Sequence, residues 1–454
     1  MSKKAQFTSR IGLIAATVGS AVGLGNVWRF PAEVQGGGGA AFLLIYIGCV
    51  LLLGIPVMLS EFTLGRAGRS DAVGALKNVG ASRPWWLVGG IAILASYLIL
   101  CFYMVVAGWT LEYLFESVTG SLFEPLSAAD AGGNSHFTAK MEQYIASDTE
   151  PLMFTMIMIV INLGILLAGV QKGIERVSNV MMPVFFVVLA VFVGVALTLP
   201  DAAGGLRYFL QPDFSKVTGR TVISALGQAF FSLSLGMGIL ITYSAYFSSK
   251  VPLVRTAVTV SLLDLLVAVM MGLVIFPAIT SFGLDGESIR GASLVFVTLP
   301  EVFSHMGLTQ LWSVLFFFLL AIAALTSTIS IAEVTVSFII DRFHTSRVRA
   351  CLWVTLPLIP AAAICSLSMG SWSHITLFGM NIFDFLDNFA TNILLPLGSI
   401  LLCVYIGWFA PRKLMYDQLS NRGELHSRLI PAVIWTVRYV APALILIVLV
   451  SAFI

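Results

Sequence analysis

The stretch Gly19-Ser20-Ala21-Val22-Gly23-Leu24-Gly25-Asn26 lies inside an apolar run that is otherwise long enough to cross a bilayer. Each of its three glycines costs about 1 kcal/mol relative to alanine in a helix. In lipid, a break in the helix would leave backbone N–H and C=O groups unpaired, which is tolerated only where protein or a cavity covers them. The stretch therefore predicts a helix break at which backbone dipoles face a ligand.

A second apolar run, residues 222–247, is interrupted in the same way by Ser232-Leu233-Ser234-Leu235-Gly236-Met237-Gly238. Glycine-interrupted segments at matching positions in two halves of a chain indicate the binding site of a secondary transporter. Close packing between helices is the alternative reading of each break, because glycine is common in transmembrane helices.

The composition is that of a membrane protein. Of the 454 residues, 58% are hydrophobic and 11% are charged, whereas soluble domains carry about 25% charged residues. Apolar stretches of about 20 residues recur and predict an all-α polytopic membrane protein. The eleven expected spans are residues 10–33, 40–65, 86–117, 151–169, 177–199, 221–248, 253–280, 307–341, 348–368, 381–408 and 430–453.

The basic residues favour one orientation. With the N-terminus in the cytoplasm, 18 Lys and Arg fall on the inner side and 5 on the outer side, as the positive-inside rule requires. Eleven spans then place the C-terminus outside. We expect no removable signal peptide, since no cleavage site follows a compact apolar core. The five cysteines lie in or beside apolar spans and are interpreted as buried apolar residues.

The spans divide into two sets of five and one extra helix. Because five is odd, a second copy of a five-helix unit enters the membrane upside down, which predicts an inverted repeat. The expected units are residues 1–200, 201–410 and 411–454. The outer loop 281–305 contains an apolar piece, Ala292 to Leu299, that ends before Pro300. It is expected to form a helix over the outer mouth, with a solvated loop as the alternative.

Ionisable residues inside spans are functional candidates, and here they are Arg29, Glu61, Asp264, Glu333, Asp384 and Asp387. For Glu61 we favour a structural role in holding the broken backbone of the first span or a neighbouring helix end. The hydroxyls of residues 326–328 could complete a Na⁺ site, which needs hard oxygen ligands; bonding to carbonyls of their own helix is the alternative. Between Gly173 and Pro183 the fifth span could unwind, or the proline could form a static kink.

Several motifs together resemble the neurotransmitter:sodium symporter family, in its bacterial eleven-helix amino-acid transporter branch. The first is Gly23-Leu24-Gly25-Asn26-Val27-Trp28-Arg29-Phe30-Pro31. The others are Gly36-Gly37-Gly38-Gly39-Ala40-Ala41-Phe42, Gly54-Ile55-Pro56, Gln228-Ala229-Phe230-Phe231-Ser232-Leu233-Ser234-Leu235-Gly236 and Leu325-Thr326-Ser327. The resemblance covers residues 7 to about 410 and implies the LeuT fold, a 5+5 inverted repeat with discontinuous helices 1 and 6.

The resemblance also implies two Na⁺ sites. The first would use the Ala21 carbonyl, the side chains of Asn26, Ser232 and Asp264, and the substrate carboxylate. The second would use the carbonyls of Gly19, Val22 and Ala323 and the hydroxyls of Thr326 and Ser327. The second set carries no formal charge, so this site is expected to bind weakly and to release Na⁺ first. The first shares a ligand with the substrate, which couples ion and substrate.

The implied substrate is an amino acid. Its carboxylate would meet the Leu24 and Gly25 amides, at a helix N-terminus, and the Tyr103 hydroxyl. Its ammonium would meet the carbonyls of Ala21, Phe231 and Ser234. The side-chain pocket would be formed by Ile99, Phe231, Met237, Ser327 and Ile331. Because this pocket holds no charge, we expect a neutral apolar or aromatic amino acid. The full set of substrate residues includes Ser232 as well.

The resemblance places gates on both sides of this site. Arg29 and Asp387 are implied as the outer pair, with Phe231 as a lid. Lys4 and Asp341 are implied as the inner pair, supported by Tyr246 and Glu333. The family usually has arginine at the inner position, and lysine lacks its bidentate fork, so this pair is expected to open more easily.

Asp264 departs from the family pattern, in which an amide is common near this position. A fixed carboxylate beside the first Na⁺ would replace the charge of a bound chloride, which predicts chloride-independent transport. The overall expectation is a Na⁺:amino-acid symporter of the bacterial inner membrane, with amino acid and lipid as partners and without nucleic acid. A Na⁺-dependent sensor or a channel on the same bundle is the alternative, and the sequence leaves the oligomeric state open.

Overall fold

The structure, a computed structural model, describes residues 6–125, 135–283, 292–425 and 429–453. In this part of the chain, nine helical runs are long and apolar enough to cross a membrane, and a bent pair makes ten. The sixth span has two shorter halves, of 14 and 6 residues, and completes the eleven that the sequence predicts. In its described residues the chain thus forms an all-α bundle, and its helices can be assigned to the eleven predicted spans.

The helix bounds agree with the predicted spans to within a few residues, except that the fifth span begins at Val170, seven residues before its predicted start. The first five spans are α1 (Arg10–Ala21), η1 (Gly25–Arg29) and α2 (Phe30–Gly36); α3 (Ala40–Cys49), η2 (Val50–Gly54) and α4 (Ile55–Gly68); α6 (Trp86–Thr119); α9 (Glu150–Leu167); and η5 (Val170–Glu175) with α10 (Arg176–Ala196). The other six are α12 (Gly219–Ser232) and α13 (Ile239–Ser244); α14 (Leu253–Phe282); α16 (Thr309–Phe343); α17 (Arg347–Leu367); α18 (Ile382–Asn388), η9 (Phe389–Leu394), α19 (Leu395–Val404) and η10 (Tyr405–Phe409); and α21 (Ile430–Trp435), η11 (Thr436–Val440) and α22 (Ala441–Ser451).

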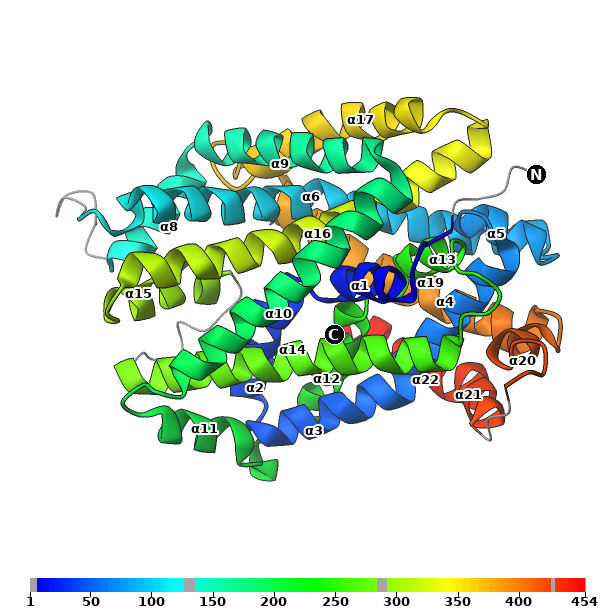
Figure 1. Cartoon of the computed structure of the whole chain (residues 1–454), viewed down its shortest axis with the longest axis horizontal. Helices are drawn as coiled ribbons and strands as arrows, with labels where there is room; N and C mark the ends of the chain where they lie inside the picture. Colours follow the sequence, from blue (N-terminus) through cyan, green and yellow to red (C-terminus); the bar gives the residue numbers. More distant parts are fainter. Residues whose placement is uncertain (1–5, 126–134, 284–291, 426–428, 454) are drawn as a thin grey trace.

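Short elements connect the spans at the two ends of the bundle. They are α5 (Ala72–Asn78), η3 (Arg83–Trp85), η4 (Ser121–Phe123), α8 (His136–Ala146), α11 (Ala202–Leu210), η6 (Phe214–Lys216), η8 (Leu294–Thr298), α15 (Leu299–Ser304), α20 (Leu414–Leu419) and the antiparallel pair β1 (Thr376–Leu377) and β2 (Met380–Asn381). The N-terminus, α5, α20 and α21 lie at one end, and α8, α11 and α15 lie at the other (Figure 1). We call these the N-terminal end and the opposite end.

The first span breaks where its glycines predict. Helix α1 ends at Ala21, and Val22 is extended, with φ −73° and ψ 105°. The helix resumes at Gly25, and its two halves are bent by 55°. The backbone of residues 22–24 is therefore free to face the interior of the bundle rather than its own helix.

The second break separates α12 from α13 and requires left-handed backbone. Ser234, Gly236 and Gly238 have φ of 53°, 78° and 73°, a region that glycine enters without steric cost. The Glu61 carboxylate accepts a hydrogen bond from the Gly236 amide at 2.7 Å. This contact confirms the structural role expected for Glu61, because it pairs an amide that the break would leave unsatisfied.

A helix covers the opposite end of the bundle, as predicted, but it is longer than expected. It runs from Leu294 through Pro300 to Ser304. Pro300 lies inside this run and does not end it, although its ring nitrogen has no N–H to donate; the π-helical turn Leu294–Thr298 directly precedes α15. The Phe296 ring lies 6.4 Å from that of Trp28 and 4.8 Å from that of Tyr113, so the helix packs over the first and third spans.

The segment between Gly173 and Pro183 is helical in this structure. Residues Val170–Glu175 form a π-helix that continues directly into α10, and Pro183 lies inside α10. In this conformation the segment is therefore helical throughout and not unwound.

Candidate functional site

A small cavity of about 30 Å³ lies between the two helix breaks. All eleven residues expected to bind substrate line it, and it adds three that the sequence analysis assigned elsewhere or omitted, Ser20, Gly23 and Asn26. They come from α1, α6, α12 and α16 and from the broken segments. The structure thus brings together residues that lie more than 300 positions apart in the chain.

The side of the cavity formed by the first break carries amide donors. The Leu24 amide donates to the Tyr103 hydroxyl at 3.3 Å. Leu24 and Gly25 precede and begin η1, where backbone N–H groups have no intrahelical acceptor and the helix dipole is positive. This side of the cavity has the chemistry to bind a carboxylate.

The other side carries oxygen acceptors. The Ser234 hydroxyl donates to the Ser20 carbonyl at 2.7 Å and so joins the two breaks. The Met237 carbonyl accepts a hydrogen bond from Ser96. Ile99, Ile331 and the Met237 side chain are buried and apolar. A zwitterion with an apolar side chain would therefore find a donor region, an acceptor region and an uncharged pocket.

Asp264, on α14, is fully buried next to the first break. The Ser232 hydroxyl lies 2.8 and 2.9 Å from its two carboxylate oxygens. The Asn26 amide donates to Oδ1 at 2.8 Å, and the Tyr46 hydroxyl donates to Oδ2 at 3.2 Å. With its amide nitrogen bound here, Asn26 turns its own oxygen toward the Gly23 amide, at 3.4 Å.

The residues of this cluster fit a Na⁺ ion. A carboxylate, an amide oxygen and a hydroxyl are hard ligands of the kind that such cations prefer. The negative charge of the Asp264 carboxylate lies where it would balance the charge of this Na⁺ without a bound chloride.

The second predicted ion site lies where α1 meets α16. A Cβ at Gly19 would be 3.2 Å from the Thr326 Cβ, and one at Gly23 would be 3.0 Å from the Ser327 Oγ. Both glycines are thus needed for this close approach. The Ser327 Oγ is buried and forms no hydrogen bond of normal geometry with any described residue. A buried, unpartnered hydroxyl costs about 1–3 kcal/mol, so it fits a bound cation.

Thr326 and Thr328 behave differently from Ser327. The Thr326 hydroxyl donates to the Ile322 and Ala323 carbonyls at 3.0 and 3.1 Å, and the Thr328 hydroxyl donates to the Leu325 carbonyl at 2.9 Å. These bonds within the helix use the hydroxyl protons of both residues and leave the lone pairs of their oxygens available to a cation.

Arg29, the cation of the predicted outer pair, contacts groups on two helices. The Arg29 Nε lies 3.9 Å from a carboxylate oxygen of Glu33, one turn further along the same helix, and the guanidinium carbon lies 5.4 Å from the centre of the Phe231 ring. In the described part of the chain, Arg29 and Asp387 form no ion pair within 4.0 Å. The i,i+4 spacing brings Glu33 within reach without any movement between helices. Arg29 and Phe231 are nevertheless stacked over the cavity, as a lid requires.

Asp384, the remaining acid near the outer end, begins a helix. Its backbone amide donates to the Asn381 side chain at 2.8 Å, and its carboxylate accepts from the Asn381 amide nitrogen at 2.7 Å. These bonds form a cap at the start of α18, so the structure gives Asp384 a local structural role.

At the N-terminal end of the bundle, Glu333 is fully buried and paired. It accepts hydrogen bonds from Arg347 at 3.1 and 2.7 Å and from the Tyr246 hydroxyl at 2.9 Å. Asp341 accepts from the Ser70 hydroxyl at 2.9 Å and the Asp71 amide at 2.8 Å. Lys4, the predicted partner of Asp341, lies outside the described residues. Sequence reasoning placed Tyr246 and Glu333 together and missed Arg347.

The N-terminal segment is fastened by a second acid that sequence reasoning missed. The Glu175 carboxylate accepts from the Thr8 amide at 2.9 Å and from the Ser9 amide at 3.1 Å. A Cβ at Gly12 would lie 2.2 Å from a Glu175 oxygen, so glycine makes room for this contact. In the sequence, only the position of Glu175 shortly after Gly173, at the start of the fifth span, could have indicated this role.

We expect Arg347→Ala to destabilise the protein strongly, because it would leave the buried Glu333 charge without its bidentate partner. Breaking one side of such a buried pair costs about 3–5 kcal/mol. Thermal unfolding in detergent should show a melting temperature several degrees lower. Arg349→Ala is the control, since this arginine is exposed two residues further along and should tolerate the change. Equal melting temperatures for the two variants would contradict the pairing.

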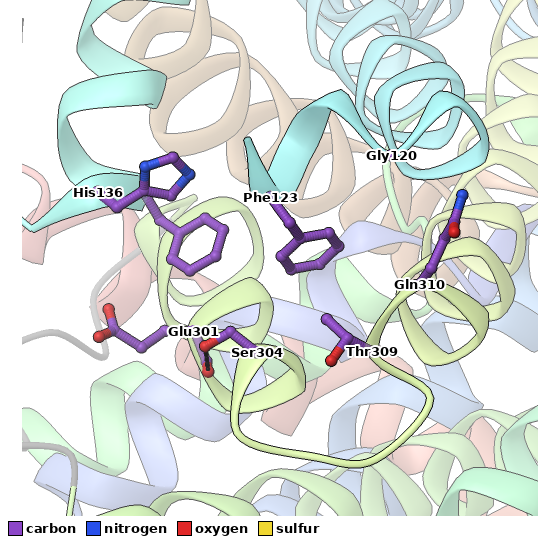
Figure 2. A pocket seen from close by; sticks show the side chains of 8 residues that line it. Gly120, Phe123, His136, Glu301, Ser304, Thr309 and Gln310 are labelled. Carbon is purple, nitrogen blue, oxygen red and sulfur yellow. Dashed lines mark hydrogen bonds between the residues drawn. The ribbon is translucent and has the colours of Figure 1, made fainter. Parts of the chain in front are cut away.

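A larger cavity, of about 530 Å³, lies at the opposite end of the bundle between η4, α8, α15 and the start of α16. Figure 2 shows Phe123 beside His136, with Glu301, Ser304 and Thr309 across from them. The His136 ring is already bonded to the Leu122 carbonyl at 3.1 Å. Neither helix break reaches this cavity, so we assign the functional site to the small chamber between the breaks.

A bundle in which two helices break around a buried, polar, ion-compatible chamber defines a secondary transporter of the LeuT fold. The chain belongs to the sodium:neurotransmitter symporter family, whose model matches residues 4–126 and 134–454. It is therefore a sodium-dependent membrane transporter.

Relatives cover the chain almost completely. It is 34% identical to the sodium-dependent transporter YhdH of Bacillus subtilis over 98% of this chain and 97% of that one. It is 27% identical to the bovine sodium-dependent dopamine transporter over 99% of this chain and 68% of that one. The crystal structure of MhsT in complex with L-phenylalanine matches with a TM-score of 0.89 and 39% identity, over 99% of this chain and 100% of that one.

Proposed function

We propose that this chain imports a neutral apolar or aromatic L-amino acid together with Na⁺ by alternating access. The observation that carries the proposal is the chamber between the two breaks, which has amide donors on one side, carbonyl acceptors on the other and an uncharged apolar pocket. The structural similarity to MhsT, whose crystals contain L-phenylalanine, supports the same substrate class.

The two ion sites are part of the same proposal. The first consists of Ala21, Asn26, Ser232 and Asp264, and shares the substrate carboxylate. The second consists of Gly19, Val22, Ala323, Thr326 and Ser327. When bound, each Na⁺ supplies positive charge that draws the broken backbone together. Moving inward down its gradient, each Na⁺ supplies about 2.3 kcal/mol per 100 mV in addition to its concentration gradient.

Chloride independence follows from Asp264. Its carboxylate is held by the Asn26, Tyr46 and Ser232 side chains, so a fixed negative charge already occupies the place next to the first ion. Together with the basic loops, the sequence supports a bacterial inner-membrane protein with its N-terminus inside and its C-terminus outside. Residues 1–200 and 201–410 would be the two repeats, and 411–454 the added loop and helix.

The test is uptake of radiolabelled amino acids into proteoliposomes. With an inward Na⁺ gradient, phenylalanine or leucine should accumulate. Replacing Na⁺ with choline should abolish uptake, and replacing chloride with gluconate should leave it unchanged. Glutamate or lysine as the best substrate would refute the substrate class. Na⁺-dependent binding without accumulation would indicate a sensor instead, and current far above substrate flux would indicate a channel.

A further inference from the structure

A cavity of about 710 Å³ lies at the N-terminal end of the bundle, between α20 and the start of the last span. It is remote from the substrate chamber, and the transport proposal gives it no role. Arg412, Lys413 and Arg438 line it together with one carboxylate, Asp417. The lining therefore carries a net charge of +2 (three cations minus one anion).

Among the described residues, carboxylates balance only part of the positive charge of this cavity. Among the described residues, Arg412, Lys413 and Arg438 form no ion pair with a carboxylate, even though Asp417 lines the same cavity. The Nε atom of Arg438 is buried and has no hydrogen-bond partner in the described part of the chain. A buried, unpaired guanidinium N–H carries a desolvation cost that an anionic oxygen would offset.

The Arg438 side chain is fixed in position before any anion binds. Its guanidinium carbon lies 4.2 Å from the centre of the Trp408 ring and 5.6 Å from that of Tyr439. The Trp408 indole donates to the Arg438 carbonyl at 3.2 Å. A Cβ at Gly407 would lie 2.9 Å from the Arg438 Cα, so this glycine allows η10 and η11 to approach closely enough for the stacking.

The opposite wall of the cavity is also held firmly. The Arg66 side chain, at the end of α4, bonds to the side chain and carbonyl of Gln418 and to the Asn421 side chain. Because Gln418 lies in helix α20, these bonds attach α20 to the end of α4. Contacts within the protein thus hold side chains on both walls of the cavity, and such preorganisation reduces the entropy lost when a ligand binds.

The surroundings of the cavity are those of a membrane interface. The last span, Ile430–Ser451, has only 17% of its apolar window buried in the protein, so most of its surface is available to lipid. Trp435 is 59% exposed and Trp408 is 51% exposed, and aromatic residues of this kind mark the headgroup level. An occupant of the cavity would have its apolar part beside this lipid-facing span.

We propose that this cavity binds the headgroup of an anionic phospholipid, with its phosphate between Arg438 and the Arg412–Lys413 pair and its acyl chains along α22. Basic pockets at helix ends on the cytoplasmic side are typical sites for acidic headgroups, and the proposed orientation places this end in the cytoplasm. The lipid-facing last span favours a lipid over a soluble phosphate, because only a lipid would also cover the exposed apolar surface.

The test is native mass spectrometry of the full-length protein in mild detergent, titrated with phosphatidylglycerol or phosphatidylcholine. We expect retention of phosphatidylglycerol at concentrations about tenfold or more below those needed for phosphatidylcholine. Because each basic residue near a membrane surface contributes about a fivefold factor in affinity, Arg438→Gln should weaken phosphatidylglycerol binding about fivefold. The triple variant Arg412→Gln, Lys413→Gln, Arg438→Gln should weaken it about 100-fold.

A matched control removes three exposed cations outside the cavity, Lys172→Gln, Arg176→Gln and Arg255→Gln. It should retain phosphatidylglycerol like the unaltered chain. Melting temperatures of all variants verify that each is folded. If the triple variant does not fold, the single variant Arg438→Gln tests the proposal. Equal loss in the control, or no preference between the two lipids, would overturn the proposal. Displacement of phosphatidylglycerol by millimolar inorganic phosphate would also overturn it in favour of a soluble anion.

Discussion

Asp264→Asn is expected to lower the apparent Na⁺ affinity for substrate uptake by about 100-fold or more. The carboxylate of Asp264 accepts hydrogen bonds from the Asn26, Tyr46 and Ser232 side chains. An asparagine would remove the negative charge that faces the ion and would point an amide donor at one of these donors. Losing one side of a buried charge pair costs about 2–5 kcal/mol, and 2.7 kcal/mol corresponds to about 100-fold.

The measurement is the Na⁺ dependence of amino-acid uptake into proteoliposomes, in chloride and in gluconate. If the carboxylate replaces a mobile anion, the asparagine variant should recover part of its activity in chloride and none in gluconate. Asp148→Asn is the control, because that carboxylate is exposed in the loop before α9 and its removal should leave the Na⁺ dependence unchanged. An Asp264→Asn variant with unaltered Na⁺ affinity would place the first ion elsewhere.

The sequence predicts the two helix breaks well because the signal is local. Gly236 and Gly238 adopt positive φ, and Val22 is extended between the halves of the first span. Residues that favour non-helical backbone therefore predict the break without any knowledge of how the helices pack. The spans are equally predictable, since about 20 apolar residues are needed to cross lipid in any fold. The substrate residues that the family motifs imply do line one chamber.

Partners of charged side chains are much less predictable, because they depend on which helices meet. Glu333 binds Arg347, which lies beyond the end of its helix. Glu175 binds the Thr8 and Ser9 amides from more than 160 positions away. Arg29 lies 3.9 Å from Glu33 on its own helix, a contact that the sequence analysis did not include. An apolar stretch predicts that a helix spans the membrane, but it does not predict which partner each polar side chain contacts.

Ser327→Ala is expected to reduce Na⁺-dependent uptake by about 10- to 100-fold without destabilising the Na⁺-free protein. Its Oγ is buried and forms no hydrogen bond of normal geometry with any described residue, so its removal takes away a poorly satisfied polar group. The free energy of unfolding in choline should stay the same or rise by about 1 kcal/mol. The second Na⁺ would lose one of five oxygen ligands in a site without formal charge, and a hydrogen-bond-like contact to a charged group is worth about 1.5–3 kcal/mol.

Ser330→Ala is the matched control, three residues further along α16. The Ser330 hydroxyl donates to the Thr326 carbonyl at 2.7 Å and accepts from the Tyr243 hydroxyl at 2.7 Å. Its loss should leave Tyr243 unpaired and lower the melting temperature in choline, while the Na⁺ dependence of uptake is retained. Thermal unfolding in choline and in Na⁺ separates the two effects, since an ion that binds only the folded state raises its stability. If both variants lose stability in choline and both keep their response to Na⁺, Ser327 holds structure and the second ion does not bind there.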